Sequence, residues 1–229
     1  MRITLNDIGK RYNKEWIFRH LHYKFTPDNA YVILGANGSG KSTLLQVIAG
    51  NFLPSEGSID YWQDSDLKTN DSGLRAKDAL PATLNATHGS IAVENIFQYL
   101  SFASPYLELL EEYTLLESIR FHAKFKNFYP GLSVEKIISI CELEKSKDKE
   151  IKYFSSGMKQ RVRLALAILC DTPLLLLDEP ASNLDAKGIE WYQKLTNDFS
   201  KNRLVIVCSN EQKQEYEYCN RELKIEEYK

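Results

Sequence analysis

The residues that could do chemistry gather first in a glycine-rich stretch near the N-terminus. Gly35-Ala36-Asn37-Gly38-Ser39-Gly40-Lys41-Ser42-Thr43 follows the apolar run Tyr31–Leu34 and precedes the helical pattern Leu44–Ala49. A strand, a glycine-rich loop, Lys-Ser and a helix in this order are a phosphate-binding P-loop in its expected context. Glycines let backbone N–H groups approach a polyphosphate, and the helix N-terminus presents its positive end to the same anion.

The polar side chains of this loop have expected roles. Lys41 is expected to reach the β- and γ-phosphates of a nucleoside triphosphate, and the Ser42 hydroxyl to ligate Mg²⁺. An ordinary glycine-rich turn is the alternative, but such a turn does not require every fixed position and both flanks to match. The predicted phosphate-binding residues are Gly35, Asn37, Gly38, Ser39, Gly40, Lys41, Ser42 and Thr43.

A pair of acids provides the second chemical signal. Asp178 and Glu179 end the continuous apolar run Leu174–Leu177, which is typical of a strand buried on both faces. Asp178 is a candidate carboxylate for Mg²⁺, and Glu179 could polarise a water molecule as a general base. The pair alone is weak evidence, but together with the P-loop it predicts phosphoryl transfer to water.

The elements that must position these residues alternate between helices and strands. This alternation, with strands that are apolar throughout, predicts an α/β fold with a parallel sheet, preceded by antiparallel strands. Antiparallel strands are expected in residues 1–34, with a further strand at Ser58–Trp62. Helices are expected at Leu107 to about Leu143, Lys159–Cys170 and Gly188–Ser200. Apolar strands are expected at Leu174–Leu177 and Leu204–Cys208, followed by a charged helix and the edge strand Glu222–Glu226.

Composition narrows the class of protein. The chain has 229 residues, 43% hydrophobic, with a formal net charge of −2, which suits one large domain or two lobes and gives no reason to expect nonspecific nucleic-acid binding. The four cysteines form no C-x-x-C pair and are expected to be free thiols in a reducing cytosol. No signal peptide and no run of about 18 apolar residues is visible, so a partner is expected to supply any membrane-spanning part.

Two segments are expected to have structural rather than chemical roles. Residues 70–89 are polar and aperiodic, which predicts a loop insertion that is dispensable for folding. His122 lies on an apolar helix face with Leu115 and Ile119, so it is expected to be a packing residue and not a ligand.

The order of motifs resembles that of the ATP-binding cassette (ABC) ATPases over nearly the whole chain. The P-loop matches Walker A, Leu174–Glu179 matches Walker B with its catalytic glutamate, and Ser182–Asp185 matches the D-loop. Phe154-Ser155-Ser156-Gly157-Met158 is similar to the Leu-Ser-Gly-Gly-Gln signature, which distinguishes this family from other P-loop ATPases. Tyr12 falls where the family has an adenine-stacking aromatic, although without the resemblance a half-buried strand residue is the better interpretation.

Several positions depart from the family pattern. The signature has Ser156 in place of glycine and Met158 in place of glutamine. Where the family has a Q-loop glutamine, Ser104 is the nearest polar residue and a weak candidate for Mg²⁺. Asn210 occupies the position of the switch histidine, and an amide can donate a hydrogen bond to a γ-phosphate but cannot shuttle a proton.

The resemblance implies an architecture and a function. It implies a P-loop NTPase core of RecA type with an antiparallel β subdomain in residues 1–103 and 157–229, and an inserted α-helical subdomain in residues 104–156. Family members work as head-to-tail dimers, so Ser155, Ser156 and Gly157 would meet, in trans, the ATP and Mg²⁺ held by the partner copy. Asp185 of the D-loop is implied to contact nucleotide as well.

The implied function is that of the ATP-hydrolysing subunit of an ABC transporter. Such a subunit would be cytoplasmic, at the inner face of the cell membrane. It would energise transport through an integral membrane subunit, and its signature sequence is more similar to those of export-type cassettes. A soluble ABC ATPase and a weakly hydrolysing, nucleotide-dependent dimerisation switch are the alternatives. The departures at Ser104 and Asn210 keep the second of these open.

Overall fold

A five-stranded sheet carries most of the apolar runs of the sequence. It is seen in the computed structural model, which describes residues 1–63 and 89–229. Each neighbouring pair in this sheet is parallel. Every residue of its two central strands β7 and β8 is buried, as expected of a sheet covered on both faces. The strand order is β6 (Leu100–Ala103), β7 (Leu174–Asp178), β8 (Leu204–Ser209), β3 (Ala30–Leu34) and β9 (Arg221–Lys224).

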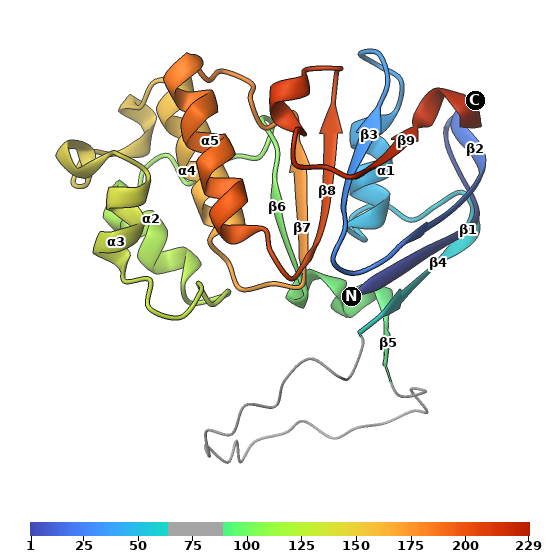
Figure 1. The fold of residues 1–229 in the computed structure, drawn as a ribbon, viewed down its shortest axis with the longest axis horizontal. Coiled ribbons are helices and arrows are strands. Elements are labelled where there is room, and N and C mark those ends of the chain that lie inside the picture. Colours follow the sequence, from blue (N-terminus) through green and yellow to red (C-terminus); the bar gives the residue numbers. More distant parts are fainter. Residues whose placement is uncertain (64–88) are drawn as a thin grey trace.

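A second, antiparallel sheet packs beside the first (Figure 1). Its order is β2 (Glu15–Phe25), β1 (Arg2–Tyr12), β4 (Glu56–Trp62) and β5 (Ser90–Ile91). The prediction that residues 1–34 form antiparallel strands is confirmed for β1 and β2 and wrong for β3, which joins the parallel sheet. Tyr31–Leu34 is buried throughout, and a strand of that kind needs cover on both faces.

Helices cover both faces of the parallel sheet. Helix α1 (Lys41–Ile48) packs on one face, in a core shared with the antiparallel sheet and with Leu174 and Leu176 of β7. The alternate residues Leu175 and Leu177 face a second core on the other side. That core contains residues of α2 (Leu115–His122), α3 (Val134–Ile140), α4 (Ser156–Ile168) and α5 (Ala186–Phe199) (Figure 1).

The predicted helix over Leu107 to about Leu143 is two shorter helices. Thr114 caps α2 through a reciprocal capping box with Glu117, so the helix begins there and not at Leu107. Pro130 and the left-handed Gly131, at φ 85°, separate α2 from α3, because the residue before a proline avoids helical geometry. Segment 104–156 contains α2, α3 and the 3₁₀ turns Glu144–Ser146 and Ile151–Tyr153.

Two further expectations need comment. The charged helix predicted after β8 is only the 3₁₀ turn η4 (Lys213–Glu215). The edge strand predicted at Glu222–Glu226 is present as β9, but it ends at Lys224 and the 3₁₀ turn Ile225–Tyr228 follows it. The predicted loop insertion 70–89 lies outside the described residues except for Gly89, whose carbonyl accepts a hydrogen bond from Gln63 N at 2.7 Å.

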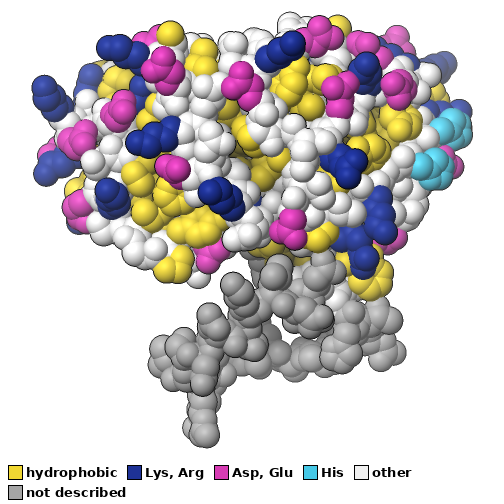
Figure 2. Space-filling view, in the orientation of Figure 1, with side chains coloured by type: hydrophobic (Ala, Val, Ile, Leu, Met, Phe, Trp, Pro, Cys, Tyr) yellow, Lys and Arg dark blue, Asp and Glu magenta, His cyan; other side chains and the backbone are white. Residues whose placement is uncertain are grey.

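Charges of both signs are mixed over the surface. Figure 2 shows lysine and arginine interspersed with aspartate and glutamate over one face, and no single-sign field dominates it. The four cysteines are free thiols, as predicted, and three of them are buried. Within residues 1–63 and 89–229, none of the helices combines the length and apolarity needed to cross a membrane.

Candidate nucleotide site

The predicted chemical residues meet at one edge of the parallel sheet. The P-loop follows β3, Ser104 follows β6, Asp178 and Glu179 end β7, and Asn210 follows β8. Because these strands are parallel, their carboxyl ends lie at the same edge, where α/β sheets bind ligands.

The backbone of the P-loop requires glycine at two positions. Gly38 and Gly40 have φ of 77° and 105°, in the left-handed region that other residues adopt only with strain. A Cβ on Gly40 would also lie 2.5 Å from Cγ2 of Ile17, which belongs to the β1–β2 hairpin. Gly40 therefore brings the hairpin against the loop as well as opening α1 as its N-cap.

Two buried polar side chains of the loop are available to an anion. Lys41 is 4% exposed and its Nζ donates to the carbonyl oxygens of Gly35, at 2.8 Å, and Ala36, at 3.0 Å. Ser39 Oγ is buried and has no hydrogen-bond partner among the described residues. A buried hydroxyl without a partner is costly. A phosphate oxygen would satisfy Ser39, and Lys41 would neutralise its charge.

Oxygen atoms suited to Mg²⁺ surround Asp178. Ser42 Oγ donates to Asp178 Oδ1 at 3.0 Å, and Ser104 Oγ donates to Oδ2 at 3.3 Å. Burial, followed by the charge of Glu179, raises the pKa of Asp178, although Ser42, Ser104 and Lys41 oppose that change. A divalent cation would remove the cost of keeping this carboxylate ionised.

The donor set fits Mg²⁺ rather than a softer metal. Mg²⁺ is usually held by one or two protein oxygens together with waters and substrate phosphates. The part of the chain that the structure describes contains no group of three or more His, Cys, Asp or Glu able to hold a metal ion.

Glu179 is held in an unusual backbone conformation beside this group. Its φ is 41°, in the left-handed region, and its N–H donates to Cys208 O at 2.9 Å, one step beyond the last β7–β8 pair. Non-glycine residues adopt such conformations only where the surroundings enforce them. The backbone of Glu179 is thus fixed to the end of β8.

Tyr12 and Asn210 lie at the margins of the site. Tyr12 ends β1, is 46% exposed, and has Lys10 Nζ 5.4 Å from its ring centroid. It pairs with Glu15 in the hairpin that contacts Gly40 through Ile17. Asn210 follows the buried Ser209 and is partly exposed.

The signature residues do not join the P-loop within one chain. Ser155 caps α4, its Oγ accepting from Met158 N at 3.2 Å, and Ser155 and Ser156 are exposed. Helix α4 packs in the core on the opposite face of the sheet from α1. Gly157 approaches the D-loop instead, since a Cβ there would lie 3.0 Å from Asn183 O. Asp185 caps α5 through Gly188 N at 2.8 Å.

Two buried residues of the site region were missed by the sequence analysis. Gln160 is fully buried and donates to Pro180 O at 3.0 Å, and Glu215 is 1% exposed beside Ala181. Glu215 lies in a polar run, residues 211–217, whose composition is typical of a solvated turn. No local sequence pattern distinguishes it from the other polar residues of this run.

Comparison with known proteins identifies the family. The family model described as ABC transporter matches residues 18–182, more than half of the chain. The chain belongs to the ABC transporter family. It is therefore an ATP-hydrolysing cassette whose cofactor is Mg²⁺, with the P-loop NTPase fold.

Relatives of this ABC ATPase include both exporters and importers. It is 25% identical to the cytochrome c biogenesis ATP-binding export protein CcmA of Agrobacterium fabrum, covering 92% of this chain and 90% of that one. It is 28% identical to the sulfate/thiosulfate import ATP-binding protein CysA of Synechocystis, covering 94% of this chain but only 56% of CysA. The fold matches, with a TM-score of 0.73 and 22% identity, the ATP-binding cassette MJ0796 in a dimeric post-hydrolysis state bound to ADP and Pi, covering 97% and 94% of the two chains.

Proposed function

We propose that this chain is the ATP-binding subunit of an ABC transporter that uses Glu179 as general base. The observation that carries the proposal is the buried group in which Asp178 joins Ser42 of the P-loop to Ser104. Mg²⁺ held by Ser42 and Asp178 would neutralise charge on the transferring phosphoryl group.

The residues around the phosphates divide the remaining work. Lys41, Ser39 and the backbone N–H groups of 35–43 bind and orient the phosphates, and Tyr12 stacks on the adenine. Glu179 accepts the proton of the attacking water, which Asn210 orients by a neutral hydrogen bond. Such bonds are roughly half as strong as charge-assisted ones, so the isolated subunit should turn over slowly.

The second half of the site is proposed to come from another copy of the chain. The exposed Ser155 and Ser156 at the N-terminus of α4 suit a γ-phosphate bound outside their own chain. In a head-to-tail dimer, the P-loop of one copy faces the signature of the other, and Asp185 lies near the junction. The MJ0796 cassette is dimeric with ADP and Pi, which supports dimerisation here.

Mixing two inactive variants tests this arrangement. Lys41→Ala disables the P-loop, and Gly157→Asp places a negative charge at the signature, where the γ-phosphate would bind. In a head-to-tail dimer, one of the two sites in a mixed dimer combines an intact P-loop with an intact signature. A mixture of the two proteins should therefore regain ATPase activity that neither has alone. A mixture as inactive as its components would contradict the head-to-tail site.

A groove beside Ser104 is the proposed contact for an integral membrane subunit. It has a volume of about 340 Å³ and lies between the end of β6, α2 and α4. Its rim includes Phe97, which is 60% exposed, together with the half-exposed Leu107 and Leu110, and Tyr106 beside it is 84% exposed. Exposed apolar side chains this close together mark an interaction site. Because Ser104 is on the adjoining loop, a partner here would sense the Mg²⁺ site.

The direction of transport is proposed to be export, and the location the cytoplasmic face of the membrane. Export rests on the signature Ser155–Arg161 and on the likeness to CcmA, while the similar likeness to the import protein CysA shows that overall identity does not decide direction. The helical segment 104–156 is proposed to be a subdomain that moves with the membrane partner. Transport into inside-out vesicles, measured with the partner subunit, tests the direction.

A further inference from the structure

Glu215 is a buried carboxylate that the chemistry above leaves unexplained. It ends the 3₁₀ turn η4 and is 1% exposed. Its Oε1 accepts a hydrogen bond from Ala181 N at 3.0 Å, and its Oε2 accepts one from Ser209 Oγ. Ser209 Oγ in turn accepts from Gln212 N at 3.2 Å. One carboxylate thus joins the loop after β7 to the loop after β8.

The two joined loops enclose the residues proposed to act on water. Ala181 lies two residues after Glu179, and Ser209 directly precedes Asn210. Glu179 N is itself bonded to Cys208 O, next to Ser209. The loop after β7 and the end of β8 are therefore joined twice. The backbone of Glu179 bonds to Cys208, and the carboxylate of Glu215 bonds to both Ala181 and Ser209. We call this set of contacts the ring.

The ring is anchored by rigid elements on both sides. Tyr192 of α5, which is fully buried, donates its hydroxyl to Glu215 O at 2.8 Å. On the other side, Gln160 of α4 donates to Pro180 O, which immediately precedes the Ala181 N–H that Glu215 holds. The signature helix α4 and the turn after β8 therefore form hydrogen bonds to the same peptide group, which joins Pro180 to Ala181.

Burying the carboxylate of Glu215 at this position costs free energy. Burial, and the charges of Glu179 and Asp178, raise the pKa of Glu215, while its bonds to Ser209 and Ala181 oppose this. A buried carboxylate near two others costs stability, and an apolar residue at this position would avoid that cost. The hydrogen bonds fix the geometry of two loops, which an apolar residue could not do.

We infer that Glu215 is a positioning residue for ATP hydrolysis, which holds Glu179 and Asn210 in register by joining Ala181 to Ser209. The inference rests on the proposed roles of Glu179 and Asn210. It deepens them because it gives Asn210, which lacks the charge of a histidine, a rigid support. It also connects the signature helix α4 to the loop that carries Glu179, because Gln160 of that helix donates to Pro180 O in the same loop.

Isosteric replacement separates this role from a purely structural one. Glu215→Gln can still accept from Ala181 N, but its Nε2 can only donate to Ser209 Oγ, so the bond to a charged carboxylate is replaced by a weaker neutral one. Weakening this bond should lower kcat about tenfold, whereas Glu215→Ala, which loses both bonds, should lower it about a hundredfold. The ATP dissociation constant of the full chain, measured with Mg²⁺, should change less than about twofold because the P-loop is untouched.

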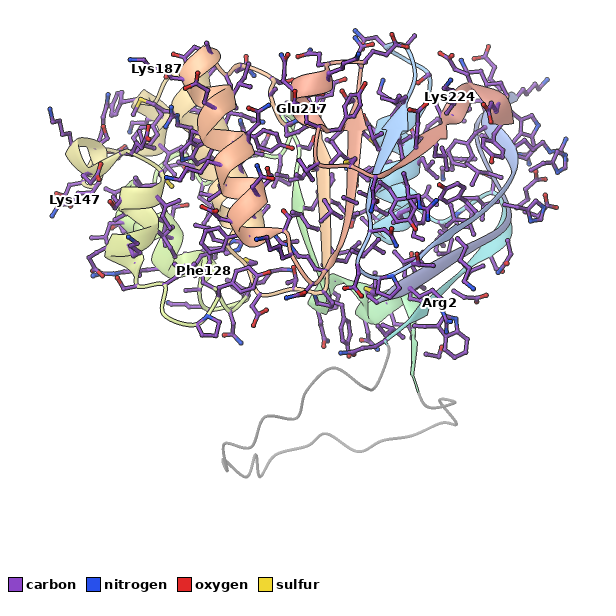
Figure 3. The ribbon with its side chains drawn as sticks, viewed as in Figure 1. Arg2, Phe128, Lys147, Lys187, Glu217 and Lys224 are labelled. Carbon is purple, nitrogen blue, oxygen red and sulfur yellow. The ribbon has the colours of Figure 1, made fainter. Side chains whose placement is uncertain are left out.

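Matched variants make the result specific. Glu217→Gln removes the same charge two residues away, where the side chain is exposed beside α5 and accepts from Gln193 (Figure 3), and it should keep the wild-type kcat. Ser209→Ala breaks the same bond from the other side. The double variant with Glu215→Gln should therefore be no slower than about tenfold, whereas independent effects would multiply to about a hundredfold.

Three results would overturn the inference. They are a Glu215→Gln kcat equal to that of Glu217→Gln, effects of Ser209→Ala and Glu215→Gln that multiply, or a loss of kcat matched by losses of ATP affinity and melting temperature. Glu179→Gln, assayed in parallel, separates this outcome from failure of the proposed function. If Glu179→Gln is active, the base is misassigned. If it is inactive while Glu215→Gln is normal, only the positioning role fails.

Discussion

The P-loop and the loops that follow β7 and β8 position residues of the same site in different ways. In the P-loop, adjacent residues do the work: left-handed glycines turn the backbone, and Lys41 folds onto the carbonyls of Gly35 and Ala36. In the other loops, buried side chains hold the segments that carry Glu179 and Asn210: Gln160 donates to Pro180 O, and Glu215 accepts from Ala181 N. With the proposed roles, binding of phosphate would depend on residues adjacent in the sequence, whereas placement of the attacking water would depend on long-range packing.

The largest effect on ATP binding and hydrolysis is expected from removing the charge of Lys41 in the P-loop. Lys41→Ala should lower ATP affinity and hydrolysis by at least about two orders of magnitude, because a buried cation facing the phosphates is lost. Its melting temperature should stay near wild type, and the exposed Lys149→Ala serves as a control for loss of one charge. Normal nucleotide affinity in a folded Lys41→Ala protein would show that the P-loop does not bind ATP in this way.

The comparison explains what could be predicted from sequence. The P-loop and the strands β7 and β8 were predicted because their signals lie in consecutive residues or in the apolar period. Glu215 was missed because its partners are 6 and 34 positions away and it stands in a polar run. The extent of the helices after Leu107 was overestimated, since an apolar period does not reveal where the chain turns at Pro130 and Gly131.

Alanine substitutions at two glycines, one in the P-loop and one outside it, test how tightly the P-loop is packed. Gly40→Ala combines a left-handed φ with a contact of 2.5 Å to Ile17, and it should reduce the free energy of unfolding by about 2–4 kcal/mol. Gly131→Ala has a similar φ but open space around its Cβ, so it should cost only about 1 kcal/mol. Urea unfolding of both variants checks this. Equal losses would mean that the hairpin does not press on the loop.

His122 tests a region outside both halves of the site. As predicted, it is a packing residue: it stacks on Phe128 (labelled in Figure 3), and its Nε2 lies 3.1 Å from Cys170 Sγ. Burial, with a smaller contribution from Lys126, lowers its pKa from 6.5 to about 4. The unfolded chain therefore binds the extra proton first, so His122 should cost no stability above pH 6.5 and progressively more as the pH falls to about 4.

Removing this imidazole should flatten that pH dependence. His122→Phe is expected to lose less stability than wild type between pH 6.5 and 4 and to keep its ATP affinity at neutral pH. Thermal unfolding over this pH range is the measurement, and parallel curves for His122→Phe and wild type would refute the assignment.

The smallest effect is expected from the polar segment. Replacing residues 70–88 with a short Gly-Ser linker should change the melting temperature by only a few degrees, because loop closure depends weakly on length. Gly89 is kept, since its carbonyl accepts from Gln63 N beside the β4–β5 pair Trp62–Ser90. A loss of stability as large as that of Gly40→Ala would show that the segment supports the core.

The central claim is that Glu179 activates water in a site that binds ATP independently of it. The most direct measurement is steady-state ATP hydrolysis by Glu179→Gln, with size-exclusion chromatography in ATP and Mg²⁺. The isosteric amide leaves the P-loop intact but cannot accept the proton, so turnover should fall to background and the protein should elute at about twice the monomer mass. Hydrolysis by Glu179→Gln at the wild-type rate would contradict the account and place the general base elsewhere.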